Sequence, residues 1–393
     1  VYFNYDNVES ISGDDYYKTA SLGATAMFQN LLSTGYGMVG YGAHEDPYKD
    51  GDWRHSGHFK YIFTGLWPVI EFSADFNDRA AMDIQKIQVS KGKMYRLYNK
   101  GTLTDKPYFE GGLKVYIPFN FSSGGINRGL IPQVKYKFTN DRYNDQILFQ
   151  HIVKKDGKDV TETYSTIGEN NISPLQTLDA SIRGYVMRQK APSQVFPSLG
   201  FGAELGFHFR PGHMKAYNPT AYLYTYGYLP GFTARQGLRL TASMEVWYGP
   251  YEEGGIMEGA LTAIPRGFVD TNLKSIINSC SESRWRVTAD YAIPFADVDW
   301  SFLSPVAYVK NFELTPFFDW SYQTFSWNHE LHYNPGAVTG ENLFSVGADL
   351  TVRLGNFFWL PYDTQIGIRY ARNFWHYIDR FPISNLNKNY IGW

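Results

Sequence analysis

The types and positions of three charged residues in the last third of the chain suit a buried ionic contact. Arg266 lies in the short segment 264–268 (IPRGF), and two carboxylates, Asp290 and Asp319, follow it. A guanidinium binds carboxylates through directional, charge-assisted hydrogen bonds, which are strong where water is partly excluded. These residues therefore suit a contact between a loop and a wall, and they suggest no bond-making chemistry.

The segments that carry the two carboxylates show a side-chain period of two. In 343–354 apolar residues alternate with Ser, Gly, Asp, Thr and Arg, and 283–295 has the same pattern. This period predicts β-strands with one apolar face and one polar face. Asp290 and Asp319 both fall on the polar face, and so does Phe317. Segments 177–187, 199–210, 237–248 and 309–321 alternate in the same way.

The number of such segments indicates which face points outward. About 14 to 16 strands can be placed along the chain, whereas barrels of about 8 strands already fill their interior with side chains. A wider barrel cannot fill its lumen with these modest apolar side chains, so the apolar face must point out and the polar face in. The outward sets carry almost no charge, with Lys310 and Arg372 as exceptions near strand ends. The pattern is typical of a barrel surrounded by lipid.

The sequence thus predicts an all-β fold, an antiparallel transmembrane outer-membrane β-barrel of about 16 strands. Residues 1–21 are predicted to be an irregular lead-in and residues 22–393 the barrel, without a linker. The predicted strands are 22–30, 35–43, 58–66, 69–77, 84–90, 108–119, 129–139, 176–187, 199–210, 219–229, 237–248, 284–295, 310–321, 343–354 and 363–375, with a short closing strand from Asn389.

Connection lengths suggest an orientation. Outer-membrane barrels have short periplasmic turns and longer extracellular loops. An even number of predicted strands separates the very long connections 140–175 and 249–283, so in an antiparallel barrel they lie on the same side. This side is predicted to be extracellular. Within the first, Asp156-Gly157 is a turn signal, and 145–168 is predicted to form a hairpin above the membrane.

Composition excludes several classes of protein. The chain is 44% hydrophobic with a mean hydropathy of −0.35, and no stretch is long and apolar enough for a membrane helix. Aromatic residues reach 18%, more than an ordinary enzyme uses and typical of the aromatic girdles of outer-membrane barrels. A net charge of −2 does not indicate the strongly basic surface of a nucleic-acid-binding protein. The single cysteine, Cys280, is predicted to be an unpaired loop thiol.

The loop and strand motifs together resemble the outer-membrane protein-assembly and translocation superfamily, the BamA-like insertases and two-partner-secretion transporters, also called bacterial surface antigens. Members are 16-stranded barrels whose sixth extracellular loop places an Arg-Gly-Phe/Tyr tip in the lumen. There the tip meets an acidic residue on strand 12 and a Phe-x-Asp-x-Gly motif on strand 13. The matching residues here form the predicted loop–lumen lock: Arg266, Gly267, Phe268, Asp290, Phe317 and Asp319.

The match departs from the family pattern at two positions. Ser321 stands where the family has Gly, and Asp290 where Glu is usual. Motif support covers residues 250–393, and upstream the resemblance rests on architecture. Family members carry periplasmic POTRA modules before the barrel, and the stretch 1–21 is too short for one.

Other chemistries have weaker support. His329 and His332, at i and i+3 beside Glu330, suit weak metal binding at most. Neither G-x-S-x-G nor H-E-x-x-H occurs, so no catalytic residue, metal site or cofactor is predicted and the chain is expected not to be an enzyme. Lumen charges suit either a selectivity lining or a mutually paired wall: Arg239, Glu245, Arg284, Arg286, Glu313, Arg353 and Arg369.

The resemblance implies a barrel in the outer membrane of a Gram-negative bacterium, acting in insertion or translocation of polypeptides or anchoring an envelope complex. The alternatives are a passive porin or plugged channel, and a purely structural subunit of an outer-membrane assembly. Expected partners are lipopolysaccharide, phospholipid and periplasmic or outer-membrane proteins, with no nucleic acid.

Overall fold

The computed structural model describes the chain from residue 22 to residue 392, with gaps. The described ranges are 22–46, 51–91, 94–167, 172–191, 194–212, 219–247, 264–268, 281–302, 304, 306–325, 339–357, 363–375 and 389–392. The predicted lead-in 1–21, Cys280, and the histidines 329 and 332 lie outside these ranges. Within them, no helix has the length and apolarity needed to cross a bilayer.

All the regular structure in the described ranges is β-strand, so the predicted all-β class is confirmed. The strands are β1 (Leu22–Gln29), β2 (Gly35–Glu45), β3 (Trp53–Phe63), β4 (Val69–Lys91), β5 (Met94–Tyr116), β6 (Phe119–Asn120), β7 (Ile126–Lys155), β8 (Lys158–Ile167), β9 (Ile172–Arg188), β10 (Gly200–Phe209), β11 (Thr220–Pro230), β12 (Gly237–Trp247), β13 (Ser281–Trp300), β14 (Tyr308–Phe325), β15 (Thr339–Gly355), β16 (Thr364–Trp375) and β17 (Asn389–Gly392).

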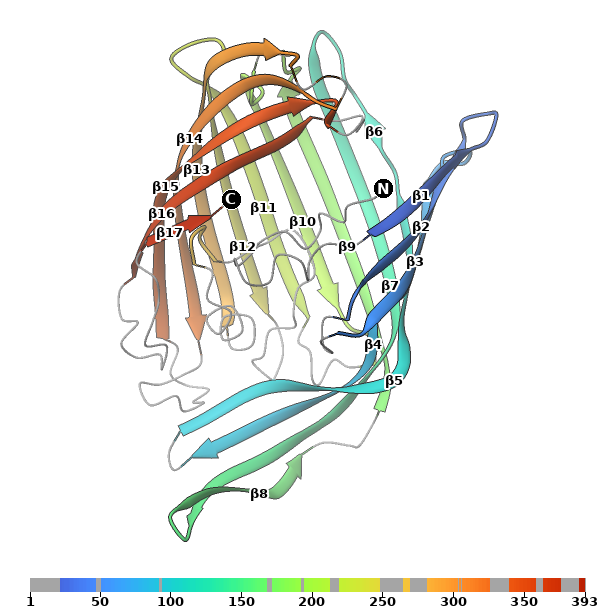
Figure 1. Cartoon of the computed structure of the whole chain (residues 1–393), viewed down its shortest axis with the longest axis vertical. Helices are drawn as coiled ribbons and strands as arrows, with labels where there is room; N and C mark the ends of the chain where they lie inside the picture. The colour runs from blue at the N-terminus through green and yellow to red at the C-terminus, as the bar shows by residue number, and fades with distance from the viewer. Residues whose placement is uncertain are drawn as a thin grey trace.

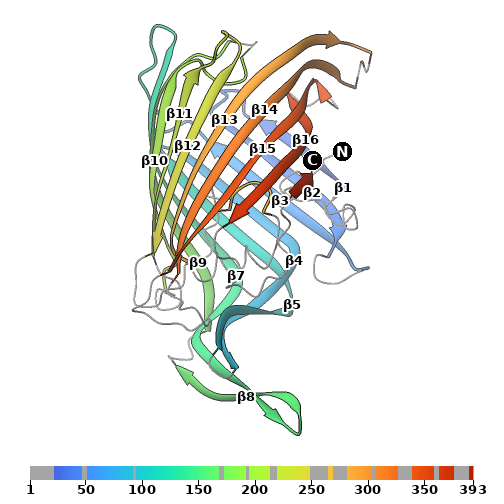
Figure 2. The same cartoon turned by 90° about the vertical axis from the view of Figure 1, so that its left-hand side faces the viewer.

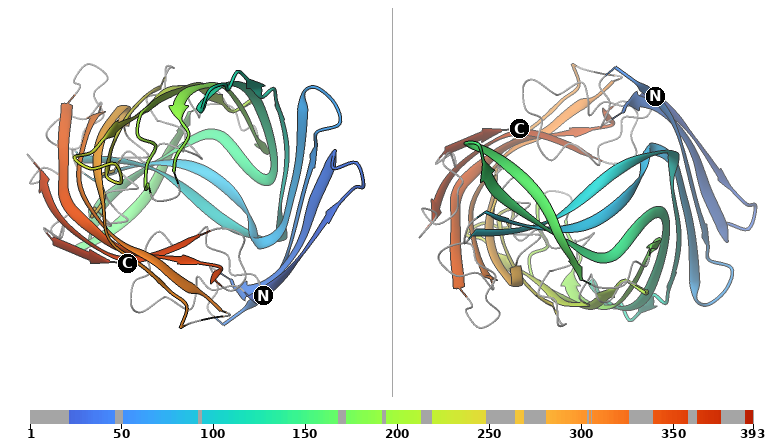
Figure 3. Two further views of the ribbon diagram at one scale, coloured as in Figure 1. Left: turned by 90° about the horizontal axis from the view of Figure 1, so that it is seen from above. Right: turned by 90° about the horizontal axis from the view of Figure 1, so that it is seen from below.

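These strands form one 17-stranded sheet that curls into a barrel (Figures 1 and 3). Successive barrel strands pair antiparallel, from β1–β2 through to β16–β17. Two members differ from the rest: β6 has two residues, and β8 is the return arm of a hairpin with β7. The sheet is therefore an antiparallel barrel close to the predicted size.

The strands alternate as predicted, with the apolar face outward. On this face Trp285, Phe318 and Leu350 are 43%, 41% and 45% exposed. On the opposite face of the same strands Asp290 and Asp319 are buried, at 1% and 0% exposed. This polarity is the reverse of a soluble protein's, and it suits a barrel surrounded by lipid, where the solvent for the outer face is hydrocarbon.

Two hairpins extend well past the barrel wall (Figures 1 and 2). One is β4–β5, and the other is β7–β8, whose turn places Asp156 and Gly157 at positive φ, 51° and 76°, as its Asp-Gly signal predicts. The far part of β4 pairs in parallel with the far part of β7, from Asp83↔Arg142 onward. The arms therefore support each other beyond the end of the barrel, across which they lie in Figure 3.

The contacts between these arms are buried and paired. Arg79 donates to both carboxylate oxygens of Asp141, at 3.0 and 2.5 Å, and its guanidinium lies 3.9 Å from the Tyr108 ring centroid. Nearby, the fully buried Tyr143 packs against Ile84 and Leu175. A small core outside the barrel thus holds the hairpins together.

One prediction of strand boundaries is wrong at these arms. Segments 69–77 and 84–90 are not two strands but parts of β4, joined across a bulge where Asn77 has a φ of 64°. The prediction also missed residues 94–107 of β5. Past the barrel both faces of a hairpin meet protein or water, so the alternation that marks a barrel strand fades there.

The long connections do share one side. Antiparallel pairing of every strand from β7 through β9 to β13 places the β7–β8 hairpin and the ends that flank 248–280 on the same side of the sheet. The turns on the opposite side, such as 231–236, are short.

The facing of β15 can be tested with two arginine substitutions. Leu350→Arg places a charge on the outer face and should destabilise the barrel by about 2–4 kcal/mol near the bilayer midplane. Thr351→Arg points inward, where its strand partner is Glu313, and should be nearly neutral. Equal yields of folded protein in lipid vesicles for the two variants would contradict the assigned facing.

Candidate functional site

Four neighbouring strands, β13 to β16, present the inner-face residues of the site in two rows. One row follows the register Asp290↔Phe317↔Gly347↔Ala371, and the next follows Thr288↔Asp319↔Ser345↔Asn373. Because the strands alternate, all eight residues point to the lumen. The rows form a wall two residues deep against which a loop can pack.

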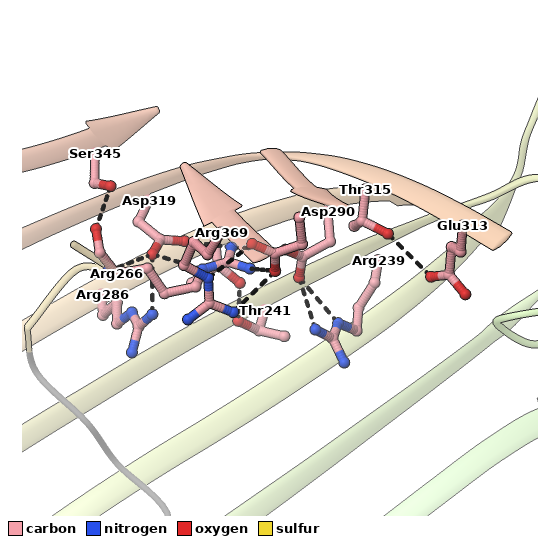
Figure 4. A network of polar contacts seen from close by, with 12 residues as sticks. Arg239, Thr241, Arg266, Arg286, Asp290, Glu313, Thr315, Asp319, Ser345 and Arg369 are labelled. Carbon is pink, nitrogen blue, oxygen red and sulfur yellow. Dashed lines mark hydrogen bonds and ion pairs between the residues drawn. The ribbon is translucent and has the colours of Figure 1, made fainter. Parts of the chain in front are cut away.

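Segment 264–268, from the connection between β12 and β13, lies against this wall (Figure 4). The Arg266 side chain donates from Nε to Asp319 Oδ2 at 2.9 Å and from Nη2 to Asp319 Oδ1 at 2.7 Å. Its Nη2 also lies 2.6 Å from Asp290 Oδ1, and its backbone N–H donates to Asp319 Oδ2 at 2.8 Å. One guanidinium therefore bridges carboxylates of two adjacent strands.

Phe317 forms the floor beneath the cation. The Arg266 guanidinium carbon lies 3.9 Å from its ring centroid, which is a cation–π distance. The ring occupies the space that Gly347 leaves on β15, because a Cβ on that glycine would come within 2.7 Å of Phe317 Cζ. Phe317 is 3% exposed, so the contact is shielded from water.

The backbone of the tip is held by the last two strands of the wall. Ser345 Oγ donates to the carbonyl of Arg266, and Asn373 Nδ2 donates to the carbonyl of Gly267 at 2.8 Å. A turn closes the segment through a hydrogen bond from the Phe268 N–H to the Pro265 carbonyl at 3.3 Å. Phe268 is 3% exposed. The tip is thus bound through side chain and backbone alike.

Gly267 has a backbone conformation and surroundings that suit glycine. Its φ is 96°, which L-residues with a Cβ rarely adopt. An added Cβ would also lie 2.7 Å from both Ala371 Cβ and Asn373 Oδ1. The tip therefore needs glycine both for its turn and for its close approach to β16.

Further arginines balance the charge of the site. Arg239 donates to Asp290 Oδ2 at 3.0 and 2.9 Å, and Arg286 contacts Asp319 Oδ2 at 3.1 Å. Arg369 forms a bidentate pair with Asp349. The charge of Arg266 is thus compensated by carboxylates of two adjacent strands.

The charged lumen residues named in the sequence all lie in ion pairs. Besides the pairs above, Arg284 lies 2.6 Å from Glu245, and Arg353 lies 3.5 Å from Glu313. Such pairing fits the interpretation of a mutually neutralised wall better than that of a selectivity lining.

The structure brings together Arg266, Asp290, Phe317 and Asp319, and buries Gly267 and Phe268 beside them. Sequence reasoning missed the contributions of Ser345, Asn373 and Arg286. The alternation showed that these side chains face inward. It did not show that residues on three different strands meet one loop tip, because no spacing in the sequence connects them.

Comparisons with known proteins extend to structure only. No sequence profile of a known protein family matches the chain, and no curated protein is similar to it in sequence. Among solved structures, CdiB from Escherichia coli matches with a TM-score of 0.47 and 8% identity, over 95% of this chain and 59% of that one. BamA from Haemophilus ducreyi lacking POTRA domains 1–3 matches with a TM-score of 0.42 and 12% identity, over 95% of this chain and 66% of that one.

The chain spans about three fifths of the length of CdiB and two thirds of that BamA chain. The likeness is one of fold and not of sequence.

The ion pair at the tip predicts a coupled loss of stability. Arg266→Ala leaves the buried Asp319 without its main partner, and Asp319→Ala leaves the guanidinium likewise; each should destabilise the barrel by about 3–5 kcal/mol. The double variant should lose less than the sum, because both changes break one interaction. Denaturant unfolding in detergent measures this. Arg142→Ala, which breaks the half-exposed pair with Asp83, is the control and should leave the stability nearly unchanged, because solvent screens an exposed ion pair. Additive losses would contradict the coupling.

Gly267→Ala separates conformational strain from crowding at the tip. The change should destabilise by more than the roughly 1–3 kcal/mol of a strained backbone conformation, because its Cβ also meets Ala371 and Asn373. Gly212→Ala is the matched control: its φ is 83°, but no atom lies within 4 Å of an added Cβ. Equal losses in the two variants, measured by the same unfolding experiment, would show that the contact with β16 is unimportant.

Proposed function

We propose that this chain is an outer-membrane barrel of the BamA-like superfamily that acts in inserting or translocating polypeptides, or anchors a larger envelope assembly. The observation that carries the proposal is the contact of Arg266 with Asp319 and Asp290, made by the residues that the superfamily's loop motif specifies. In this role segment 264–268 is a loop–lumen lock, and residues 22–393 form the membrane domain. The long connections then lie outside the cell.

The lock supports the proposal because of the strands it joins. The tip belongs to the connection between β12 and β13, yet its contacts reach β14, β15 and β16. One point of attachment therefore braces the end of the sheet that precedes β17. A wall braced in this way can stay ordered while the neighbouring edge exchanges partners.

The edges of the sheet supply the second argument. In the described part of the chain β1 pairs with β2, and β17 pairs with β16 over Arg369–Arg372, but no register of paired residues joins β1 to β16 or β17. Unpaired strand edges present backbone donors and acceptors to another strand. An incoming polypeptide strand can add there by β-augmentation, which needs no bond chemistry. Lipopolysaccharide and phospholipid would surround the outer face, and protein partners would deliver the polypeptide.

Reconstitution tests the proposal. In vesicles of outer-membrane lipid, the chain should speed the folding of a urea-denatured β-barrel protein relative to empty vesicles, measured as heat-modifiable migration on gels. A disulfide between cysteines introduced in β1 and β17 should remove the acceleration, and reduction should restore it. If the chain without the engineered disulfide does not accelerate folding, this result would contradict the role of an insertase.

Planar-bilayer recordings separate the alternative of a passive pore. A lumen with a bound loop tip and paired charges should give little steady conductance. Stable open steps in the intact chain would favour a porin, and a chain that neither conducts nor accelerates folding would be left as a structural subunit.

A further inference from the structure

A second cluster of polar side chains lies on the inner face of β3 and β4, far along the sheet from Arg266. His58 on β3 is paired in register with Asp75 on β4. Both alternate with outward apolar residues, since Phe59 and Phe76 are 40% and 49% exposed. The His58 and Asp75 side chains are 35% and 36% exposed, so they are accessible from the lumen.

A bulge in β4 adds a second carboxylate to the same face. Residues three apart in a regular strand point to opposite faces. Between Asp75 and Asp78, however, Asn77 has a φ of 64° and the register with β5 shifts. The extra residue restores Asp78 to the face that carries Asp75. Bulges often re-aim a side chain in this way beside functional sites.

The bulge is held in place by specific hydrogen bonds. Arg54 Nη1 donates to Asn77 Oδ1 at 2.9 Å, and Asn77 Nδ2 donates to the His55 carbonyl at 2.9 Å. His44 Nε2 lies 2.8 Å from the carbonyl oxygen of Asp78. The position of the Asp78 carboxylate is thus set by the two neighbouring strands.

The geometry around His58 suits a metal ligand. Its Nδ1 lies 2.8 Å from Asp75 Oδ1, the contact by which a carboxylate orients a metal-binding imidazole. Its Nε2 then faces Asp78 Oδ1 at 3.4 Å and Ser56 Oγ at 3.2 Å. Two ligands bound tetrahedrally to zinc lie about 3.3 Å apart, given bonds of about 2.0–2.1 Å. The separations match the edges of such a coordination shell.

The neighbouring strand leaves room in front of the imidazole. On β2 the residues opposite Ser56 and His58 are Gly42 and Gly40. A Cβ on Gly42 would lie 2.8 Å from Ser56 Oγ and 4.0 Å from His58 Nε2. A side chain there would occupy the approach to Nε2, and glycine keeps it open.

We propose that His58, Asp75 and Asp78 form a binding site for a divalent transition-metal ion of the zinc class. His58 Nε2 and the Asp78 carboxylate are the ligands, Asp75 fixes the imidazole tautomer, and water completes the shell. Each residue brings a ligand atom within 4.8 Å of the other two. The chemistry also fits, because two carboxylates face one imidazole and a divalent cation neutralises them. The bound ion would link β3 to β4.

Zinc titration of the metal-stripped protein in detergent, by isothermal calorimetry, tests the site. The wild type should bind one more Zn²⁺ per chain than His58→Gln. Asp78→Asn should weaken this binding at least tenfold, and Asp75→Asn by about 10- to 100-fold, the usual effect of losing an orienting partner. Binding should weaken at pH 5, where protons compete for the imidazole.

His55→Gln is the matched control, since His55 lies on the same strand but its side chain is bonded to Tyr41 instead. It should bind zinc as the wild type does. As a second readout, saturating Zn²⁺ should raise the unfolding temperature of the wild type and of His55→Gln, but not of His58→Gln. Equal zinc binding by the wild type, His58→Gln and Asp78→Asn would overturn the site. This result is independent of the proposed role in polypeptide insertion, which the folding assay tests separately.

Discussion

The structure depends on one constraint, the inverted polarity of the sheet. The outer face carries apolar side chains such as Phe318 and Leu350, and the inner face of the same strands carries mostly polar and charged ones. Inside a barrel those groups are crowded together and partly removed from water, where an unpaired charge is costly. The lumen wall of β12 to β16 meets this constraint by pairing each arginine with a carboxylate on a neighbouring strand.

The loop tip enters this paired wall as one more member. Asp319 is fully buried and accepts from Arg266 and Arg286 at once, while Asp290 is shared between Arg239 and Arg266. Such sharing makes the position of the tip specific, because a displaced guanidinium would leave a buried carboxylate short of a partner. Ser345 and Asn373 add specificity for the backbone, which a charge contact alone does not provide.

Departures from regular strand geometry mark the places where the barrel does more than enclose a lumen. The bulge at Asn77 turns Asp78 toward His58 and also begins the part of β4 that leaves the barrel. Past the bulge, β4 pairs in parallel with β7, and the Arg79–Asp141 ion pair helps to hold this part of the strand in place outside the barrel wall. One irregularity thus serves both the polar cluster and the extended arms.

The sequence by itself determined the strands whose two faces meet different surroundings. In β12 to β16 the alternation identifies the elements and their facing, because lipid and lumen impose opposite polarity on successive residues. The Asp156-Gly157 turn is likewise local, since its backbone conformation is a property of those two residues. The charges and inward facing of Arg266, Asp290 and Asp319 suggested that they could pair, and the resemblance to a known family specified that arrangement, since nothing in the spacing does.

The tertiary structure alone decided which inward residues meet. Ser345, Asn373 and Asp319 are neighbours because three strand registers align them, and register depends on the whole sheet. It also decided the extent of β4 and β5, whose outer parts are stabilised by contacts with β7 and not by a uniform environment on each face. The approach of Asp78 to His58 depends on a bulge. Side-chain alternation cannot predict a bulge, because a bulge interrupts that alternation.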